Sequence, residues 1–156
     1  MHLNEYELTV IVRPDMEDSD TLAVVEKVEG FLTQDNGTVL LRDDWGKRKL
    51  AYPIRGHLKG HYCLITFAQE ATSILEIERR LRIEEPVVRF LTVQTGTDID
   101  LDDRREVAEA TRKRLDEEAR LRAEAEAARA AAAAEAEAEA LAYAAAAANP
   151  APPADV

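Results

Sequence analysis

The chain has 156 residues, of which 46% are hydrophobic and 33% are charged, and its formal net charge is −11. These values are typical of a single cytoplasmic domain, and the only cysteine, Cys63, excludes an intramolecular disulfide and a thiolate zinc cluster. Negative charge usually counts against nucleic-acid binding, but residues 96–156 hold most of it, with 8 Lys/Arg against 15 Asp/Glu. No membrane span is expected, because glutamates interrupt the one long alanine-rich stretch.

The first third of the chain predicts two strands with a helix between them. Residues 5–13 alternate in polarity and are rich in β-branched side chains, which indicates a strand. A helix follows, with its N-cap at one of the polar residues 18–20 and its end at the turn residues 36–37. Residues 38–54 then predict a second strand that runs with interruptions.

The next segment predicts a strand, a helix and a further strand. Residues 58–67 form the third predicted strand. The second helix begins at Ser73, whose spacing to Glu76 predicts a capping box, and Pro86 ends it. Residues 87–95 predict a fourth strand. The order β-α-β-β-α-β is that of an α+β ferredoxin-like sandwich, in which two helices cover one face of a four-stranded antiparallel sheet.

The chain divides into a predicted ferredoxin-like domain, residues 1–96, and a low-complexity Ala/Glu-rich tail, residues 97–156. Alanine accounts for 18 of the 26 residues in 123–148, so the tail lacks the large apolar side chains of a core. Alanine is also the best helix former, and the prolines within 150–153 would end such a helix. We therefore expect the tail to be helical or disordered.

Two helices cover only one face of a sheet, so the other face is expected to be open. The strand residues that alternate with the core residues point toward that open face. The apolar residues expected on that face are Ile11, Tyr62, Leu64, Leu91 and Val93. An exposed apolar patch usually marks a partner site, so we expect another protein to meet this face or an adjoining sheet edge.

The sequence offers no convincing set of catalytic or metal-binding residues. Ser19 and Ser73 are interpreted as helix caps and Cys63 as a core residue. His57 and His61 lie close to Cys63 in sequence, but no fourth ligand accompanies them. We therefore expect no enzymatic activity, no metal and no cofactor.

An acid-free segment, residues 45–69, contains the sequence GKRKLAYPIR at 46–55. Its consecutive basic residues can contact phosphates, Tyr52 offers a ring for stacking, and Pro53 keeps the chain extended. These features predict contact with an anionic partner, and ordinary solvated lysines and arginines are the alternative interpretation.

This stretch resembles the signature of the bacterial small-subunit ribosomal protein six family, in which a glycine and basic residues lead into Leu-Ala-Tyr-x-Ile. The pairs Tyr6-Glu7 and Arg13-Pro14 fit the same family, as do Leu81-Arg82-Ile83 and the Val87 and Arg89 positions. The resemblance covers about residues 4–95.

The resemblance implies a constituent of the small ribosomal subunit that binds the central domain of the small-subunit ribosomal RNA together with small-subunit ribosomal protein eighteen. By position, the RNA-contact residues that it implies are Lys47, Arg48, Lys49, Tyr52 and Arg89. Further, weaker basic candidates are Arg55, Lys59, Arg79, Arg80 and Arg82. For the arginines of the second predicted helix, a solvated or salt-bridged surface is the alternative.

Two other functions remain open at this point. A ferredoxin-like regulatory module would bind a small ligand and oligomerise through its sheet, although no glycine-rich phosphate loop supports it. An RNA-recognition domain of the RRM type would display several aromatic rings on the open face, where Tyr62 is the one obvious candidate in the third strand.

Overall fold

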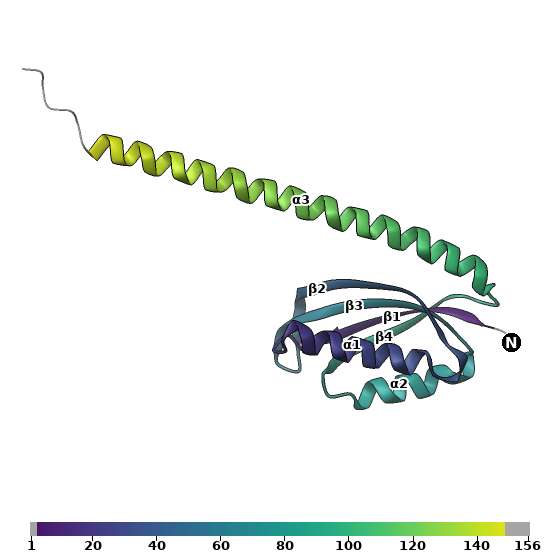
Figure 1. Cartoon of the computed structure of the whole chain (residues 1–156). Helices are drawn as coiled ribbons and strands as arrows, with labels where there is room; N and C mark the ends of the chain where they lie inside the picture. The colour runs from purple at the N-terminus through teal and green to yellow at the C-terminus, as the bar shows by residue number, and fades with distance from the viewer. Residues whose placement is uncertain (1–2, 149–156) are drawn as a thin grey trace, which may run out of the picture. The chain divides into compact units, whose positions relative to one another are not determined.

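The computed structural model describes the backbone of residues 3–148 and the side chains of residues 3–34 and 36–134. The order of its elements confirms the predicted alternation and adds one long helix (Figure 1). The strands and helices are β1 (Asn4–Val12), α1 (Asp18–Leu32), β2 (Thr38–Ile54), β3 (His57–Gln69), α2 (Ile74–Ile83), β4 (Val87–Gly96) and α3 (Leu101–Ala148).

The four strands form one antiparallel sheet in the order β2-β3-β1-β4. Helices α1 and α2 lie on the same face of that sheet (Figure 1). This arrangement confirms the predicted ferredoxin-like α+β fold. Strands β2 and β4 are the two edges, so a side chain on one edge reaches the other only if the backbone curls across the sheet.

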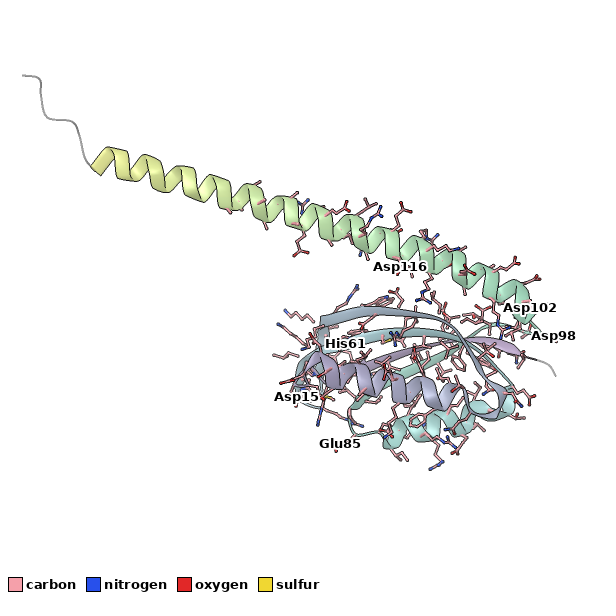
Figure 2. All side chains as sticks on the ribbon, in the orientation of Figure 1. Asp15, His61, Glu85, Asp98, Asp102 and Asp116 are labelled. Carbon is pink, nitrogen blue, oxygen red and sulfur yellow. The ribbon has the colours of Figure 1, made fainter. Side chains whose placement is uncertain are left out.

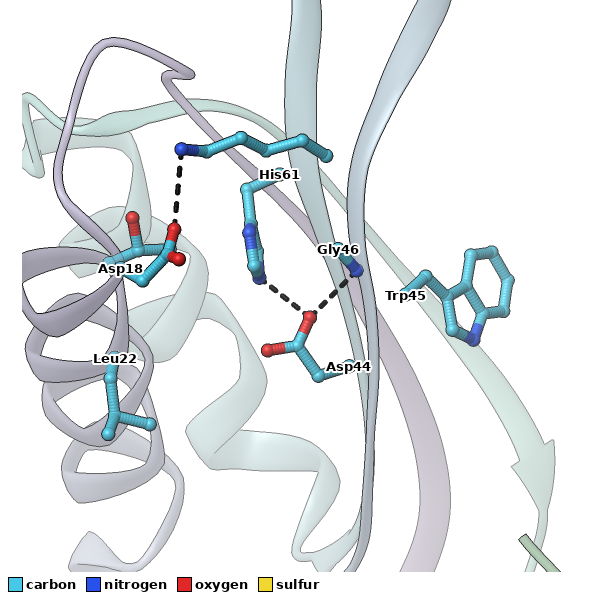
Figure 3. A pocket seen from close by; sticks show the side chains of 8 residues that line it. Asp18, Leu22, Asp44, Trp45, Gly46 and His61 are labelled. Atoms are coloured by element: carbon cyan, nitrogen blue, oxygen red, sulfur yellow. Dashed lines mark hydrogen bonds and ion pairs between the residues drawn. The ribbon is translucent and has the colours of Figure 1, made fainter. Parts of the chain in front are cut away.

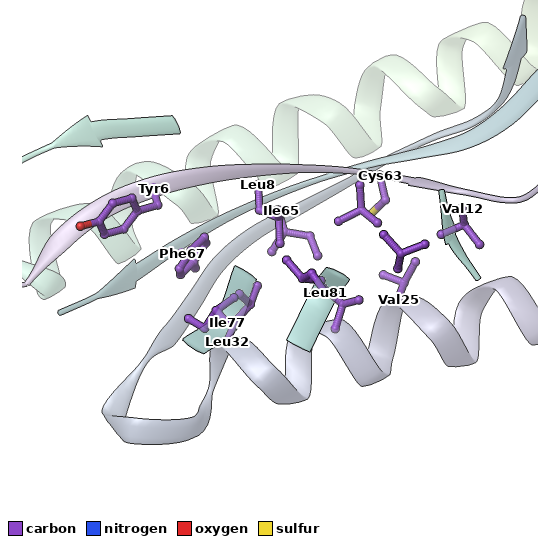
Figure 4. Packing of buried hydrophobic residues seen from close by; sticks show 13 residues of the cluster. Tyr6, Leu8, Val12, Val25, Leu32, Cys63, Ile65, Phe67, Ile77 and Leu81 are labelled. Atoms are coloured by element: carbon purple, nitrogen blue, oxygen red, sulfur yellow. The ribbon is translucent and has the colours of Figure 1, made fainter. Parts of the chain in front are cut away.

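The core lies between the sheet and the two helices (Figure 4). Alternate residues of β1 and β3 point into it, as the strand periodicity predicts, and Leu8, Ile65 and Phe67 are fully buried. Leu32 and Leu81 enter from α1 and α2. Burial of one such large apolar side chain contributes about 1.5–3 kcal/mol, so this layer fixes which face of the sheet is covered.

The predicted N-cap of the first helix is wrong, and the predicted capping bond of the second helix is absent. The N-cap of α1 is Glu17, which makes no side-chain capping bond, while Asp18 and Asp20 lie in the first turn and Ser19 is likewise inside the helix. Carboxylates in that turn still stabilise the helix through the positive end of its dipole. At the second helix, Ser73 is the N-cap, as predicted, but it has helical backbone angles and makes no capping bond. A 3-10 turn over residues 71–73 precedes α2, so Ser73 lacks the extended backbone that favours a side-chain capping bond.

The first turns of α3 belong to the same compact unit as the sheet, which extends to Thr111. The Ile99 amide donates to the Leu3 carbonyl, and Arg104 Nε lies 3.0 Å from Glu5 Oε2. These contacts carry the compact unit past Gly96, the predicted end of the domain.

The remainder of α3, residues 112–148, is a separate unit. It is a continuous helix, as alanine content favours, and Arg122 lies 4.0 Å from Glu118 one turn away. The predicted helix-ending residues Pro150, Pro152 and Pro153 lie outside the described part of the chain. None of the described helices is long and apolar enough to cross a membrane.

Candidate nucleic-acid interface

The β2–β3 hairpin extends beyond the end of β1. The last residue of β1, Val12, pairs with His61, so residues 57–60 of β3 lie beyond the pairing with β1. Ile54 pairs with His57 across a two-residue turn in which Arg55 and Gly56 have φ of 47° and 84°. Two positive φ angles are typical of a type I′ turn, whose twist matches that of the flanking strands.

The part of the hairpin beyond β1, residues 48–60, is called the hairpin tip, and it curls over the open face of the sheet. A Cβ atom on Gly60 would lie 2.5 Å from Ile11 Cγ2 and 3.8 Å from Leu50 Cδ2, so glycine permits these side chains to close over β3. Leu50 is 5% exposed and Ile11 is 7% exposed. The expectation that Ile11 contributes to an exposed patch is therefore wrong, because the hairpin covers it.

The curl brings together two predicted contact residues from opposite edges of the sheet. Arg89 Nη1 on β4 donates to Tyr52 Oη on β2 at 2.8 Å. Tyr52 remains 57% exposed, so its ring is available for stacking while its hydroxyl is used. The sequence did not predict this contact, since strands β2 and β4 are not neighbours.

The three consecutive basic residues of β2 do not act as one group, because strand residues alternate between faces. Lys47 Nζ lies 3.3 Å from Asp18 Oδ1 and 3.4 Å from the Met16 carbonyl, so it turns toward α1. Arg48 instead lies over the Trp45 ring, 5.0 Å from its centroid. Lys49 lies opposite Lys59 in the adjacent strand, and neither makes an ion pair with a described acidic residue.

A hollow of about 610 Å³ lies between the start of α1 and strand β2 (Figure 3). His61 Nε2 lies 2.6 Å from Asp44 Oδ1, and Lys47 pairs with Asp18 at its rim. The polar side chains of this hollow therefore contact one another across it. The contact of His61 with Asp44 was missed by sequence reasoning, because it follows from a bulge in β2 at residues 44–46.

The contact of His61 with Asp44 does not amount to a metal site or a catalytic centre. The described residues contain no cluster of three His, Cys, Asp or Glu side chains that could hold a metal ion. Burial raises the pKa of the Cys63 thiol to about 12, with a smaller contribution from the nearby Asp44 carboxylate. Cys63 is therefore a protonated core residue at neutral pH.

The open face also carries an aromatic pair. The rings of Trp45 and Tyr62 stack with centroids 6.5 Å apart, and Trp45 Nε1 donates to Asp43 Oδ2 at 2.7 Å. Across β1 from this pair, Leu91 and Val93 are 61% and 45% exposed. Sequence reasoning missed Trp45, although its position at the start of the acid-free segment is a usable signal. Leu64, which pairs with Thr9, lies half-buried between these groups.

The first turns of α3 border the other end of this face. A hollow of about 180 Å³ is lined there by Glu7 and Thr66 of the sheet and by Val107 and Thr111 of the helix. The open face is therefore limited at one end by the hairpin tip and at the other by the start of α3.

The arginines of α2 divide into two groups. Arg79 Nε and Arg80 Nε lie 2.8 and 2.9 Å from Glu76 oxygens. Hydrogen bonds from Arg79 and then Arg80 lower the pKa of the Glu76 carboxyl from 4.5 to about 2. Arg82 lines a different hollow with Arg55 and Arg89. The salt-bridged interpretation therefore holds for Arg79 and Arg80.

Comparison with known proteins gives the same family over the same residues. The family model of ribosomal protein S6 matches residues 5–94. The small ribosomal subunit protein bS6 of Syntrophotalea carbinolica is 46% identical over 91 residues, which cover 58% of this chain and 79% of that protein. The bS6 protein of Desulfatibacillum aliphaticivorans is 36% identical over 100 residues, 64% of this chain, and the match spans only about half of that relative, 54%.

A solved structure has the same fold. The crystal structure of 30S ribosomal protein S6 from Thermotoga maritima matches with a TM-score of 0.57 and 23% sequence identity, covering 70% of this chain and 98% of the other. At that identity the likeness shows the fold alone. The family match, by contrast, covers more than half of the sequence, and the chain belongs to the ribosomal protein S6 family.

Proposed function

We propose that this chain is a structural constituent of the small ribosomal subunit in the cytoplasm, where it binds small-subunit ribosomal RNA. The observation that carries the proposal is the β2–β3 hairpin, whose tip presents basic side chains without acidic neighbours in sequence from residue 45 to residue 69. The ribosomal protein S6 family is structural and not enzymatic, which confirms the expectation of a non-catalytic chain.

The case for phosphate binding by the hairpin rests on its basic side chains that lack an acidic partner. Arg48, Lys49 and Lys59 make no ion pair with a described acidic residue, so they can neutralise phosphates without giving up an existing partner. Tyr52 adds an exposed ring on which a base can stack, and Arg89 holds its hydroxyl. Lys47 contributes less in this proposal, because Asp18 already partners it.

The open face supports the second part of the proposal, a protein partner. Leu91 and Val93 are exposed beside the Trp45–Tyr62 pair, which makes this face apolar and accessible. The partner that the family resemblance implies is small-subunit ribosomal protein eighteen. The proposed contact residues for this partner are Tyr62, Leu64, Leu91 and Val93, together with Trp45. Ile11 is no longer among them, because the hairpin buries it.

Charge reversal at the hairpin tests the RNA contact. The double variant Arg48→Glu/Lys49→Glu should bind small-subunit ribosomal RNA at least about tenfold more weakly. The slope of log affinity against log salt should fall by roughly 0.7 for each phosphate that the variant no longer neutralises. The matched control is Arg112→Glu/Arg114→Glu, which makes the same change of charge on the exposed helix α3. Equal affinities and slopes for the two variants would contradict the proposed contact.

A further inference from the structure

Three arginines from different parts of the chain line one hollow of about 200 Å³ beside the edge strand β4. Arg55 comes from the turn of the β2–β3 hairpin, Arg82 from the last turn of α2, and Arg89 from β4 itself. Buried Leu81 and Val87 contribute to its lining. A water molecule takes up about 30 Å³ in the liquid, so the hollow has room for a small anion with part of its hydration shell.

Among the described residues, none that lines this hollow carries a carboxylate. The two acidic residues that follow α2 are occupied elsewhere: Glu84 lies 2.8 Å from Lys27 Nζ, and Glu85 lies 3.5 Å from Arg13 Nη1. Figure 2 shows Glu85 at the same end of the domain as Asp15, the other acidic partner of Arg13. The acidic turn therefore does not neutralise the neighbouring arginines.

The arginines themselves bind only neutral acceptors or none. Arg55 Nη1 donates to the Val87 carbonyl at 3.3 Å, and Arg89 Nη1 donates to Tyr52 Oη at 2.8 Å. Arg82 makes no hydrogen bond or ion pair with the described residues. Each guanidinium carries five N–H donors, so most of them remain available to an anion at this site.

Arg55 occupies a backbone position that favours another residue. The first central position of a type I′ turn prefers Asn, Asp or Gly, because other side chains are strained at positive φ. Arg55 adopts φ of 47° there, and its side chain reaches back to Val87 on β4. The backbone of this position does not favour arginine, so the presence of Arg55 there points to a role for its side chain.

We propose that Arg55, Arg82 and Arg89 form a binding site for a phosphate group, and that the group is a backbone phosphate of the bound RNA. Guanidinium groups suit this ligand because their planar donors contact phosphate oxygens in pairs. This inference rests on the proposed RNA-binding function and extends the contact surface from the hairpin, around β4, to the end of α2.

The test uses the full chain and variants that preserve the fold. Arg55→Asn places a favoured residue in the turn, so its melting temperature should equal or exceed that of the parent chain. The double variant Arg55→Asn/Arg82→Gln should lower the slope of log affinity against log salt by roughly 0.7, the value for one phosphate, in binding to small-subunit ribosomal RNA. The matched control is Arg79→Gln, which removes one arginine from the same helix and should leave the slope unchanged.

The outcomes separate this site from the proposed function. An unchanged slope in Arg55→Asn/Arg82→Gln, together with a lowered slope in Arg48→Glu/Lys49→Glu, would overturn the arginine site and leave the hairpin contact standing. If neither variant changed RNA binding, both the arginine site and the proposed hairpin contact would be contradicted. Titration with inorganic phosphate, followed through the arginine Nε–H resonances, shows whether the site binds free phosphate or the phosphate of an RNA backbone. Saturation by phosphate with an unchanged RNA slope would overturn the assignment to RNA.

Discussion

The β2–β3 hairpin and helix α2 are both rich in basic residues, but they differ in what those residues touch. On α2, Arg79 and Arg80 bind the same carboxylate of Glu76. On the hairpin, Arg48 lies over an aromatic ring and Lys49 faces another lysine. A basic residue attracts a polyanion only where no acidic neighbour already neutralises it, so the hairpin is the stronger candidate surface.

The largest expected effect concerns how the hairpin is held. Leu50→Ala should destabilise the domain by about 2–5 kcal/mol in urea unfolding, because Leu50 is 5% exposed and covers Ile11 with the hairpin tip. Leu75→Ala on α2 is the control, since Leu75 is 78% exposed and its truncation should cost less than about 0.5 kcal/mol. Similar small losses in both variants would mean that the tip is not anchored to the sheet.

A smaller effect concerns the contact between Tyr52 and Arg89. Tyr52→Phe removes the acceptor of the 2.8 Å hydrogen bond but keeps the ring, so it should lower the unfolding free energy by about 0.5–1.5 kcal/mol. RNA affinity should fall further in Tyr52→Ala, which also removes the stacking surface. Tyr62→Phe is the control, because its hydroxyl bonds no described residue. Equal stabilities for Tyr52→Phe and Tyr62→Phe would show that the edge-to-edge contact contributes nothing.

The smallest effect concerns Glu76, and it sharpens the contrast with the hairpin. Its pKa in the folded chain is about 2, below the ordinary 4.5, so its ionised form adds stability above pH 4.5 that is lost as pH falls toward 2. Glu76→Gln should remove this part of the acid dependence in a denaturation series between these pH values. Glu78→Gln, on the same helix and without an ion pair to a described residue, should leave this acid dependence of stability unchanged. Identical pH profiles for the two variants would contradict the pairing.

The sequence predicted the sheet well because strand alternation is a local property. Leu8 and Val10 on β1, and Ile65 and Phe67 on β3, all face the helices as their spacing indicates. The capping box at Ser73 was wrong for the opposite reason, although the position of the cap was right. Ser73 has the residue type and spacing of a cap, but the 3-10 turn before it fixes its backbone in a helical conformation that no side-chain pattern reveals.

The candidate site was predicted by residue type but not by arrangement. Lys47 and Arg48 are adjacent in sequence, yet the strand sends them to opposite faces, one to Asp18 and one to Trp45. Arg89 and Tyr52 were each identified by family resemblance, while their contact depends on a hairpin that curls over two intervening strands. Such contacts depend on tertiary geometry, which periodicity does not encode.

Sedimentation of a cell lysate tests the central claim most directly. The chain should travel with the small ribosomal subunit at low salt. Arg48→Glu/Lys49→Glu should shift it toward the free fraction as salt rises, while Arg112→Glu/Arg114→Glu should behave like the parent chain. A parent chain that stays in the free fraction at all salt concentrations would contradict its assignment to the small subunit.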